Sequence, residues 1–191
     1  KVSNLLVSHK DGQITPSLLS IEFGSKNEEY YTFIETEIEL MKDILGDQNH
    51  PQYSTYKQMF KEQYEDLEET VNDLDNFDFL FEQLPNFWGQ LKIELVNSGE
   101  NSTCDYIDWT SSYGFIIVSG QAVDRGTTVE GLTVTYMPRF PSQQSDTQTQ
   151  RARFLGYKNH YKGFIRVYSD AAAMEFYTNY GWVENDFRNL V

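Results

Sequence analysis

The residues Phe115-Ile116-Ile117-Val118 form an unbroken apolar run that is preceded by Gly114 and followed by Ser119. A run of this length is typical of a strand that is buried on both faces, as in the centre of a parallel sheet. Other short strand-like runs occur along the chain and alternate with stretches that suit helices, which predicts an α/β fold with a parallel sheet. The expected strands are residues 2–8, 91–96, 115–118, 132–136 and 164–168.

Two long stretches between residues 25 and 75 have helical spacing instead. Ser25 to Glu28 forms a capping box, in which a hydroxyl and a carboxylate satisfy the free amides at a helix start. Apolar residues then recur every three or four positions up to Gly46, and again from about Ser54 to Leu74. We expect two helices that form an antiparallel hairpin and use their apolar stripes for packing. Shorter helices are expected from Ser145 to about Leu155 and from Asp170 to about Tyr180.

This alternation divides the chain of 191 residues into two parts. Residues 1–20 and 90–191 are expected to form the α/β core, and residues 25–88 are expected to be a helical insertion between them. The length suits a single domain with a hydrophobic core of its own. Because the chain begins at Lys1 without a methionine, we expect it to be an excised part of a longer protein.

The charge of the chain is uneven. Its net charge is −14, and residues 21–100 hold 19 acidic but only 5 basic side chains. Residues 121–170, in contrast, hold seven basic and four acidic side chains. We expect the acidic surface of the helical insertion to be solvated, with the binding of a protein partner as the alternative. The basic part is where we expect an anion to bind.

Two segments of the basic part follow predicted strands, at the end where ligands bind in parallel sheets. One is residues 119–131, and the other is the expected short helix that carries Arg151 and Arg153. Backbone amides and threonine hydroxyls position phosphate groups, and arginine supplies charge and a planar fork of donors. The two segments together therefore predict a site for a phosphate-bearing ligand.

Several chemical signatures are absent from the sequence. It contains no Gly-x-x-x-x-Gly-Lys-Ser/Thr phosphate loop, so we do not expect the chain to hold a nucleoside triphosphate by itself. Neither Asp-x-Lys nor Glu-x-Lys occurs, which argues against a nuclease centre of that type, although other two-metal centres need no such pair. The scattered histidines and the single cysteine, Cys104, predict no metal site. No apolar run is long enough to cross a membrane, and we expect a cytoplasmic protein.

Several blocks of residues, taken in their order and spacing, resemble the Z1 domain family. This family comprises helicase-like ATPases of bacteria and viruses, often labelled endonucleases, which occur beside restriction, repair and phage-defence genes. The resemblance covers residues 4–8 and nearly all of residues 113–168, whereas the acidic helical stretch carries no matching motif. The matching blocks are Gly120, Asp124-Arg125-Gly126-Thr127-Thr128, Glu130-Gly131-Leu132-Thr133, Asp146-Thr147, Gln150, Arg153-Phe154, Gly156-Tyr157, Tyr161 and Arg166-Val167-Tyr168.

Two of these blocks are also similar to the fifth and sixth motifs of superfamily-two helicases, which lie on the second RecA-like lobe. The resemblance implies a RecA-like parallel sheet flanked by helices. It further implies that Gln150 and Arg153 face ATP and Mg²⁺ held by a first ATPase lobe of the same longer chain, with Arg153 as an arginine finger on the γ-phosphate. The residues it assigns to binding nucleotide or nucleic acid are Gly120, Asp124, Arg125, Gly126, Thr128, Gly156 and Lys158.

The sequence departs from these patterns at two positions. The helicase pattern usually has an acid at Thr128, and the family commonly has arginine at Lys158, where an ammonium group lacks the bidentate fork. Arg153 can alternatively form a salt bridge to an acid such as Asp124 that merely orders the loops. Three functions stay open. They are the second motor lobe of a nucleic-acid-dependent ATPase, which we favour, part of a metal-dependent endonuclease, and a non-catalytic module that docks a partner on the acidic helices.

Overall fold

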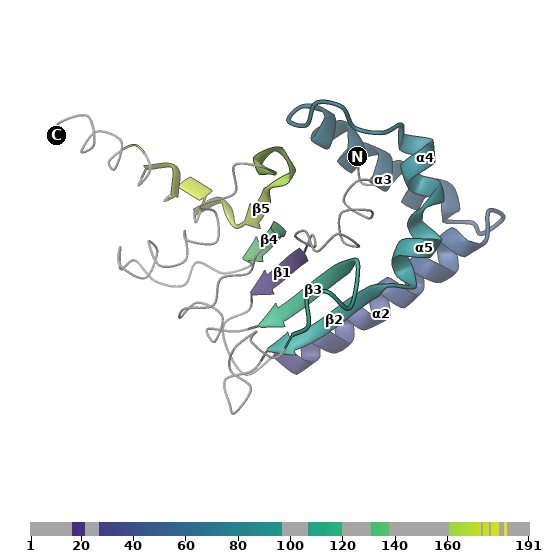
Figure 1. Ribbon diagram of the computed structural model, residues 1–191, viewed down its shortest axis with the longest axis horizontal. Helices are drawn as coiled ribbons and strands as arrows, with labels where there is room; N and C mark the ends of the chain where they lie inside the picture. Colours follow the sequence, from purple (N-terminus) through teal and green to yellow (C-terminus); the bar gives the residue numbers. More distant parts are fainter. Residues whose placement is uncertain are drawn as a thin grey trace.

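A parallel β-sheet organises the computed structural model, which describes residues 17–21, 27–96, 107–119, 131–137, 161–172, 174–175, 177–179 and 182. Five strands form this sheet in the order β2-β3-β1-β4-β5. All neighbouring strands are parallel, and the arrows in Figure 1 point the same way. The predicted α/β class is therefore confirmed. The strands are β1 (Ser17–Ile21), β2 (Leu91–Val96), β3 (Gly114–Ser119), β4 (Leu132–Met137) and β5 (Arg166–Ser169).

The apolar run that starts at Phe115 forms the buried strand β3. All six residues of β3 are buried, and β2 and β1 pair with the strand on either side. The expected strands at 91–96 and 132–136 match β2 and β4. The last expected strand, 164–168, begins two residues later than predicted, because Lys162–Phe164 forms a short 3-10 turn ahead of β5.

The central strand β1 was not predicted from the sequence. It consists of Ser-Leu-Leu-Ser-Ile, in which serine and leucine have only modest strand propensity. The first strand predicted from the sequence is residues 2–8, and that segment lies outside the described residues. β1 pairs with β3 on one side and with β4 on the other, so it joins the two halves of the sheet.

The helix α2 (Asn27–Gly46) packs against β2 and β3, and Figure 1 shows it behind these strands. Glu28 and Glu29 in its first turn complement the partial positive charge of the helix start. Its Ile38 is buried in a cluster with Ile116 and Val118 of β3. Around this cluster pack further partly buried side chains, namely Tyr30, Tyr31, Ile34, Met41, Trp88, Leu91, Ile93 and Leu95.

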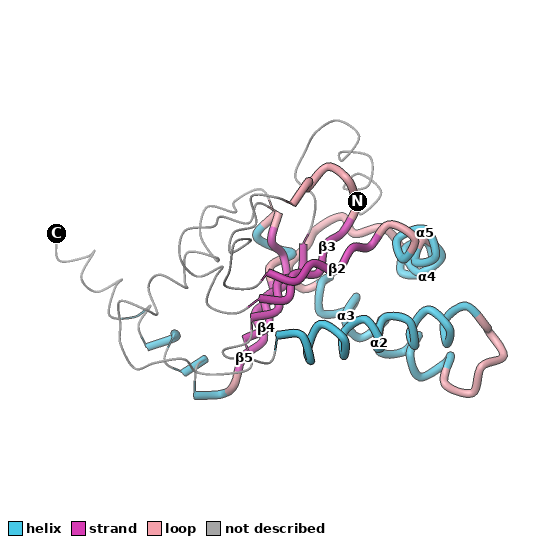
Figure 2. Tube along the Cα trace, turned by 90° about the horizontal axis from the view of Figure 1, so that it is seen from below, coloured by secondary structure: helices cyan, strands magenta, loops and turns pink. Residues whose placement is uncertain are grey.

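The helix α3 (Tyr53–Glu68) runs back beside α2, so the predicted helical hairpin is present (Figure 2). The prediction that this helix continues to Leu74 was wrong, because α3 ends at Glu68 and Asp73 adopts a left-handed φ of 67°. Two short helices that the sequence analysis did not separate then follow, α4 (Phe77–Glu82) and α5 (Leu84–Trp88). The side chain of Asn76 caps α4 by accepting a hydrogen bond from the backbone N–H of Asp78.

Aromatic rings join α3 to α4 and α5. Phe60 of α3 meets Phe81 of α4 at a centroid distance of 6.0 Å and Trp88 of α5 at 6.4 Å. Both contacts are edge-to-face, which is a favoured geometry for aromatic pairs. The four helices described between β1 and β2 are therefore linked to each other and, through α2, to the sheet.

Two expected helices lie near the carboxyl end of the chain. The one at residues 145–155 falls outside the described residues. The other is supported, since every described position from 171 to 182 is helical. Within the described residues, no helix is long and apolar enough to cross a membrane. The division into a core of residues 1–20 and 90–191 and an insertion of residues 25–88 stays a prediction.

Candidate functional site

The five strands end together along one edge of the sheet. Val96 of β2 pairs with Ser119 of β3, and Ser119 pairs with Ile21 of β1. On the other side of β1, Met137 of β4 pairs with Ser169 of β5. These residues are the last of their strands, so the chain leaves all five strands at a common carboxyl edge.

The connections between strands change direction at one point along this carboxyl edge. From β1 the chain crosses to β2 on one side of the sheet, whereas from β4 it crosses to β5 on the other side. Connections that diverge in this way open a crevice outside the carboxyl ends of the strands, and ligands bind there in α/β proteins. In this chain the crevice is expected between β1 and β4.

Both sequence segments with predicted site residues leave the sheet beside this point. The segment from Gly120 begins directly after β3, and the segment from Pro138 begins directly after β4, so the two start on either side of β1. The predicted site residues themselves lie outside the described residues, and their mutual geometry is therefore not described. These residues are Gly120, Asp124, Arg125, Gly126, Thr128, Gln150, Arg153, Gly156 and Lys158.

The two segments also return to the sheet at one place. The first ends at Gly131 and the second at Tyr161, and the backbone N–H of Gly131 donates a hydrogen bond to the Tyr161 hydroxyl at 3.2 Å. Gly131 has a φ of 74°, a left-handed conformation that favours glycine. Both residues belong to the blocks that resemble the family. The hydrogen bond fixes the return points of the two segments relative to each other.

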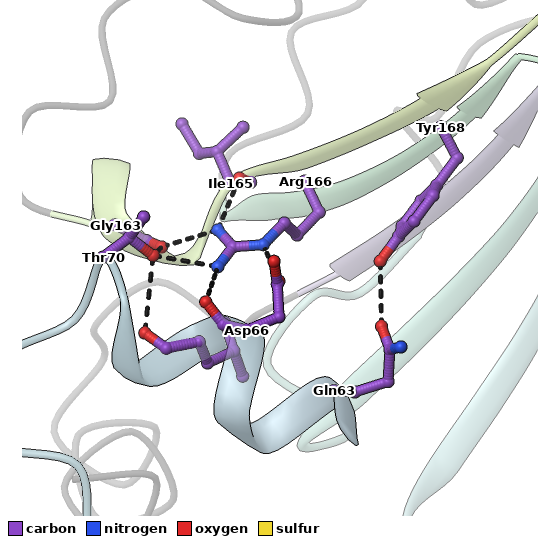
Figure 3. A network of polar contacts seen from close by, with 8 residues as sticks. Gln63, Asp66, Thr70, Gly163, Ile165, Arg166 and Tyr168 are labelled. Carbon is purple, nitrogen blue, oxygen red and sulfur yellow. Dashed lines mark hydrogen bonds and ion pairs between the residues drawn. The ribbon is translucent and has the colours of Figure 1, made fainter. Parts of the chain in front are cut away.

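Close to this return point, Arg166 ties β5 to the end of α3 (Figure 3). Its Nε donates to the Asp66 carboxylate, and one terminal nitrogen donates to the Asp66 carbonyl at 2.7 Å and to the Thr70 hydroxyl at 2.9 Å. The other terminal nitrogen donates to the carbonyls of Gly163 at 2.9 Å and Ile165 at 3.0 Å. The guanidinium has five N–H donors, and these five contacts can use all of them.

Two more contacts make the same junction tighter. The Thr70 hydroxyl donates to the Gly163 carbonyl at 2.7 Å, and the Tyr168 hydroxyl donates to Gln63 Oε1 at 3.0 Å. A Cβ atom on Gly163 would lie 2.5 Å from the Thr70 carbonyl oxygen, so only glycine fits there. Because Arg166 is engaged by the protein itself, we assign it to anchoring α3 and not to binding a ligand.

A cavity of about 300 Å³ lies beside this junction and is mostly apolar. Tyr64 lines it, and burial, followed by a hydrogen bond to Glu68, raises the pKa of the Tyr64 hydroxyl. Other lining residues, including Thr133 and Arg166, stand at the amino ends of their strands. The cavity therefore lies away from the carboxyl edge, and we interpret it as space between α3 and the sheet.

The described residues contain no group of three histidine, cysteine, aspartate or glutamate side chains that could hold a metal ion. Any contribution of the segments at the carboxyl edge to a metal site lies outside the described part of the chain.

Comparison with known proteins gives one match. The Z1 domain matches residues 19–191, which is most of the chain. The chain belongs to the Z1 domain family. No curated protein and no solved structure shows significant similarity to it. The match to the Z1 domain includes residues 27–88, so the helices that carry no recognised motif are part of the family domain. It begins after residues 4–8, which the sequence analysis had included in the resemblance.

Two contacts within the Z1 domain could not be predicted from the sequence. Arg166 was noted as part of a matching block, but its partner Asp66 lies 100 positions away, and no local pattern links them. The contact between Gly131 and Tyr161 was missed for the same reason. Arg166, Gly131 and Tyr161 all lie in blocks that resemble the family, but the resemblance gave none of them a role.

Proposed function

We propose that this Z1 domain is the second, RecA-like motor lobe of a nucleic-acid-dependent ATPase. In this proposal a first lobe of the longer protein holds ATP and Mg²⁺ on its own phosphate loop. The Z1 domain closes on the nucleotide with its carboxyl edge and couples hydrolysis to nucleic acid. The gene neighbourhood typical of the family suggests a role in restriction, repair or phage defence.

One observation carries the proposal. The segments that contain Arg125 and Arg153 leave the carboxyl edge from β3 and β4, the two strands that flank β1, and their return points are hydrogen-bonded to each other. In parallel sheets, the segments that follow the carboxyl ends of the strands around such a crevice commonly supply its ligand-binding residues. This placement supports a shared site for the two arginine-bearing segments, although Arg125 and Arg153 are 28 positions apart in the sequence.

Within this proposal the residues have separate roles. Arg153 stabilises the charge that develops on the γ-phosphate, and Gln150, three positions earlier, lies on the same face of the expected helix. Arg125, Gly126 and Thr128 connect the nucleotide to the nucleic-acid strand. Asp124 and Lys158 are charged groups at the same site, and Gly120 and Gly156 allow close approach of the backbone.

The test uses the longer protein with both lobes and measures steady-state ATPase activity with and without nucleic acid. Arg153→Ala is expected to lower turnover at least about a hundredfold, since a finger acts mainly in the transition state. Arg153→Lys is expected to fail as well, because an ammonium group cannot reproduce the planar fork. Arg151→Ala is the matched control, because positions 151 and 153 would be about 200° apart around the expected helix. Near-normal turnover of Arg153→Ala, or a worse defect in Arg151→Ala, would contradict the assignment.

The Z1 domain alone offers a second measurement. Because its sequence has no phosphate loop, we expect neither micromolar ATP affinity in calorimetry nor hydrolysis above a blank. Tight binding or turnover by this chain alone would place the nucleotide on the Z1 domain itself and would refute the two-lobe proposal.

A further inference from the structure

The apolar cavity of about 300 Å³ beside the Arg166 junction is large for a protein interior. Interiors are packed about as densely as organic crystals, and voids larger than a water molecule are few. Pockets that bind small molecules, in contrast, begin at about this volume and are lined mostly by hydrophobic and aromatic side chains. The cavity is bordered by residues of α3, α4, α5, β4 and β5. Its aliphatic lining consists of Leu67, Leu74, Leu80 and Val134.

The charged side chains of the cavity already neutralise each other. Among the described residues that line it, only Asp66 and Arg166 carry a formal charge, and they form an ion pair. Arg166 makes further hydrogen bonds to Thr70 and to the carbonyls of Gly163 and Ile165. A charged ligand would therefore lose its hydration in the cavity without meeting an unpaired counter-charge. The lining favours an uncharged ligand.

The cavity reaches the surface of the protein beside Tyr168. This side chain lines the cavity and is also 43% exposed to solvent. Its hydroxyl donates to Oε1 of Gln63, which lines the cavity too, so this hydrogen bond joins β5 to α3 at the entrance (Figure 3). Further aromatic rings of the lining belong to Tyr64, Phe87 and Phe164. These rings suit an aromatic ligand, because aromatic pairs gain stability from offset or edge-to-face contacts.

We propose that this cavity is a binding site for a small, uncharged aromatic molecule. The ring of the ligand packs among the leucines and aromatic side chains, and the ligand fills the space between α3 and the strands β4 and β5. Its binding stabilises the same junction that Arg166 anchors. This inference is independent of the proposed ATPase function, because Thr133 and Arg166 place the cavity at the amino ends of their strands, away from the carboxyl edge.

The first experiment compares three ligands that share a fluorinated ring and differ in charge, namely para-fluorobenzyl alcohol, para-fluorobenzylamine and para-fluorobenzoate. Fluorine NMR titration with this chain at neutral pH is expected to show saturable binding of the alcohol, with a Kd of about 1 mM or tighter. The two ions should bind at least about tenfold more weakly, because each must be dehydrated without a counter-charge. Absence of saturable binding of the alcohol, or binding of either ion as tightly as the alcohol, would overturn the proposal.

A second readout locates the bound alcohol without any substitution. Nuclear Overhauser effects are expected between the protons of its ring and the methyl groups of Leu67, Leu80 and Val134, which line the cavity from α3, α4 and β4. Overhauser effects to other methyl groups of the chain, and none to these three side chains, would place the ligand elsewhere and refute the proposal.

The third experiment fills the cavity. Leu67→Trp adds volume from α3 and is expected to weaken binding of the alcohol at least about tenfold, because the larger side chain takes the place of the ligand. Met59→Trp is the matched control on the same helix, since Met59 is 54% exposed and does not line the cavity, and it should change affinity less than about twofold. Val134→Phe fills the same space from β4 and should repeat the loss if Leu67→Trp fails to fold. Equal affinities of the filled variants and Met59→Trp would refute a site in this cavity.

Discussion

Removing the guanidinium of Arg166 should detach the end of α3 from β5. The informative change is Arg166→Met, because methionine keeps much of the aliphatic stem and removes all five N–H donors. The Arg166 side chain is only 17% exposed, whereas its partner Asp66 is 48% exposed. After the substitution the Asp66 carboxylate can therefore be rehydrated, but the carbonyls of Gly163 and Ile165 lose donors in a partly buried place.

The size of the effect follows from these exposures. An ordinary hydrogen bond contributes about 1 kcal/mol net, and one that involves a charged group about 1.5–3 kcal/mol. Five such contacts are not additive, because water replaces several of them at the exposed side. We expect a loss of about 2–4 kcal/mol in the free energy of unfolding. An exposed ion pair such as Lys57 with Asp78, at 2.9 Å, should contribute less than about 1 kcal/mol.

The assay is equilibrium unfolding in urea, followed by circular dichroism, with Lys57→Met as the matched control. A double-mutant cycle of Arg166→Met with Asp66→Asn gives the coupling between the two side chains, which we expect to be about 1–2 kcal/mol. Hydrogen exchange should be accelerated in the last turn of α3 in Arg166→Met. If Arg166→Met loses no more stability than Lys57→Met, Arg166 does not anchor α3 and the reasoning is refuted.

Three further predictions concern packing and pH. Gly163→Ala should destabilise the fold by at least about 1 kcal/mol, because the added Cβ would lie 2.5 Å from the backbone oxygen of Thr70. The control Gly46→Ala, whose Cβ meets nothing within 4 Å, should be neutral or slightly stabilising, and equal stabilities of the two variants in urea unfolding would contradict this. The free energy of unfolding of wild type should exceed that of Tyr31→Phe by a constant amount below about pH 10, and the difference should shrink above it. The reason is that the pKa of the Tyr31 hydroxyl is raised in the folded state, so the unfolded chain loses the hydroxyl proton first as the pH rises. Urea unfolding at several pH values measures the difference, and a difference that grows above about pH 10 would contradict this prediction. Ile38→Ala should lower the free energy of unfolding by about 2–4 kcal/mol, since Ile38 is 9% exposed in the core cluster, whereas Phe33→Ala, at 58% exposure, should lower it by less than about 1 kcal/mol. Equal losses of stability in thermal unfolding would mean that α2 does not pack as described.

Much of the fold could be predicted from the sequence because its determinants are local. The apolar run at Phe115 and the strand-like runs at β2 and β4 fall within single elements, and so does the four-three spacing of α2. β1 was not predicted because Ser-Leu-Leu-Ser-Ile has no distinctive strand pattern. Its place in the sheet depends on its pairing with β3 and β4. The helical spacing of apolar residues continues up to Leu74, although α3 ends at Glu68. Beyond that end, the Thr70 hydroxyl donates a hydrogen bond to the Gly163 carbonyl, which lies far away in the sequence.

The candidate site could be predicted only in part. Local motifs indicated which two segments carry the arginines, but the strand order that starts both segments beside β1 is a property of the whole sheet. The link between Gly131 and Tyr161 and the anchor between Arg166 and Asp66 join positions 30 and 100 residues apart. Contacts of such sequence separation leave no periodic signal that a single sequence can reveal.

The central claim is that the carboxyl edge of this Z1 domain supplies Arg153 to a nucleotide held by another lobe. The most direct measurement is the affinity of the two-lobe protein for ADP with aluminium fluoride, a mimic of phosphoryl transfer, compared with its affinity for ADP alone. Arg153→Ala should weaken binding of the mimic by about a hundredfold or more and leave ADP affinity within about twofold, because the finger acts on the transferring group. If the variant binds the mimic as tightly as wild type does, or loses affinity for ADP to the same extent, Arg153 is not an arginine finger.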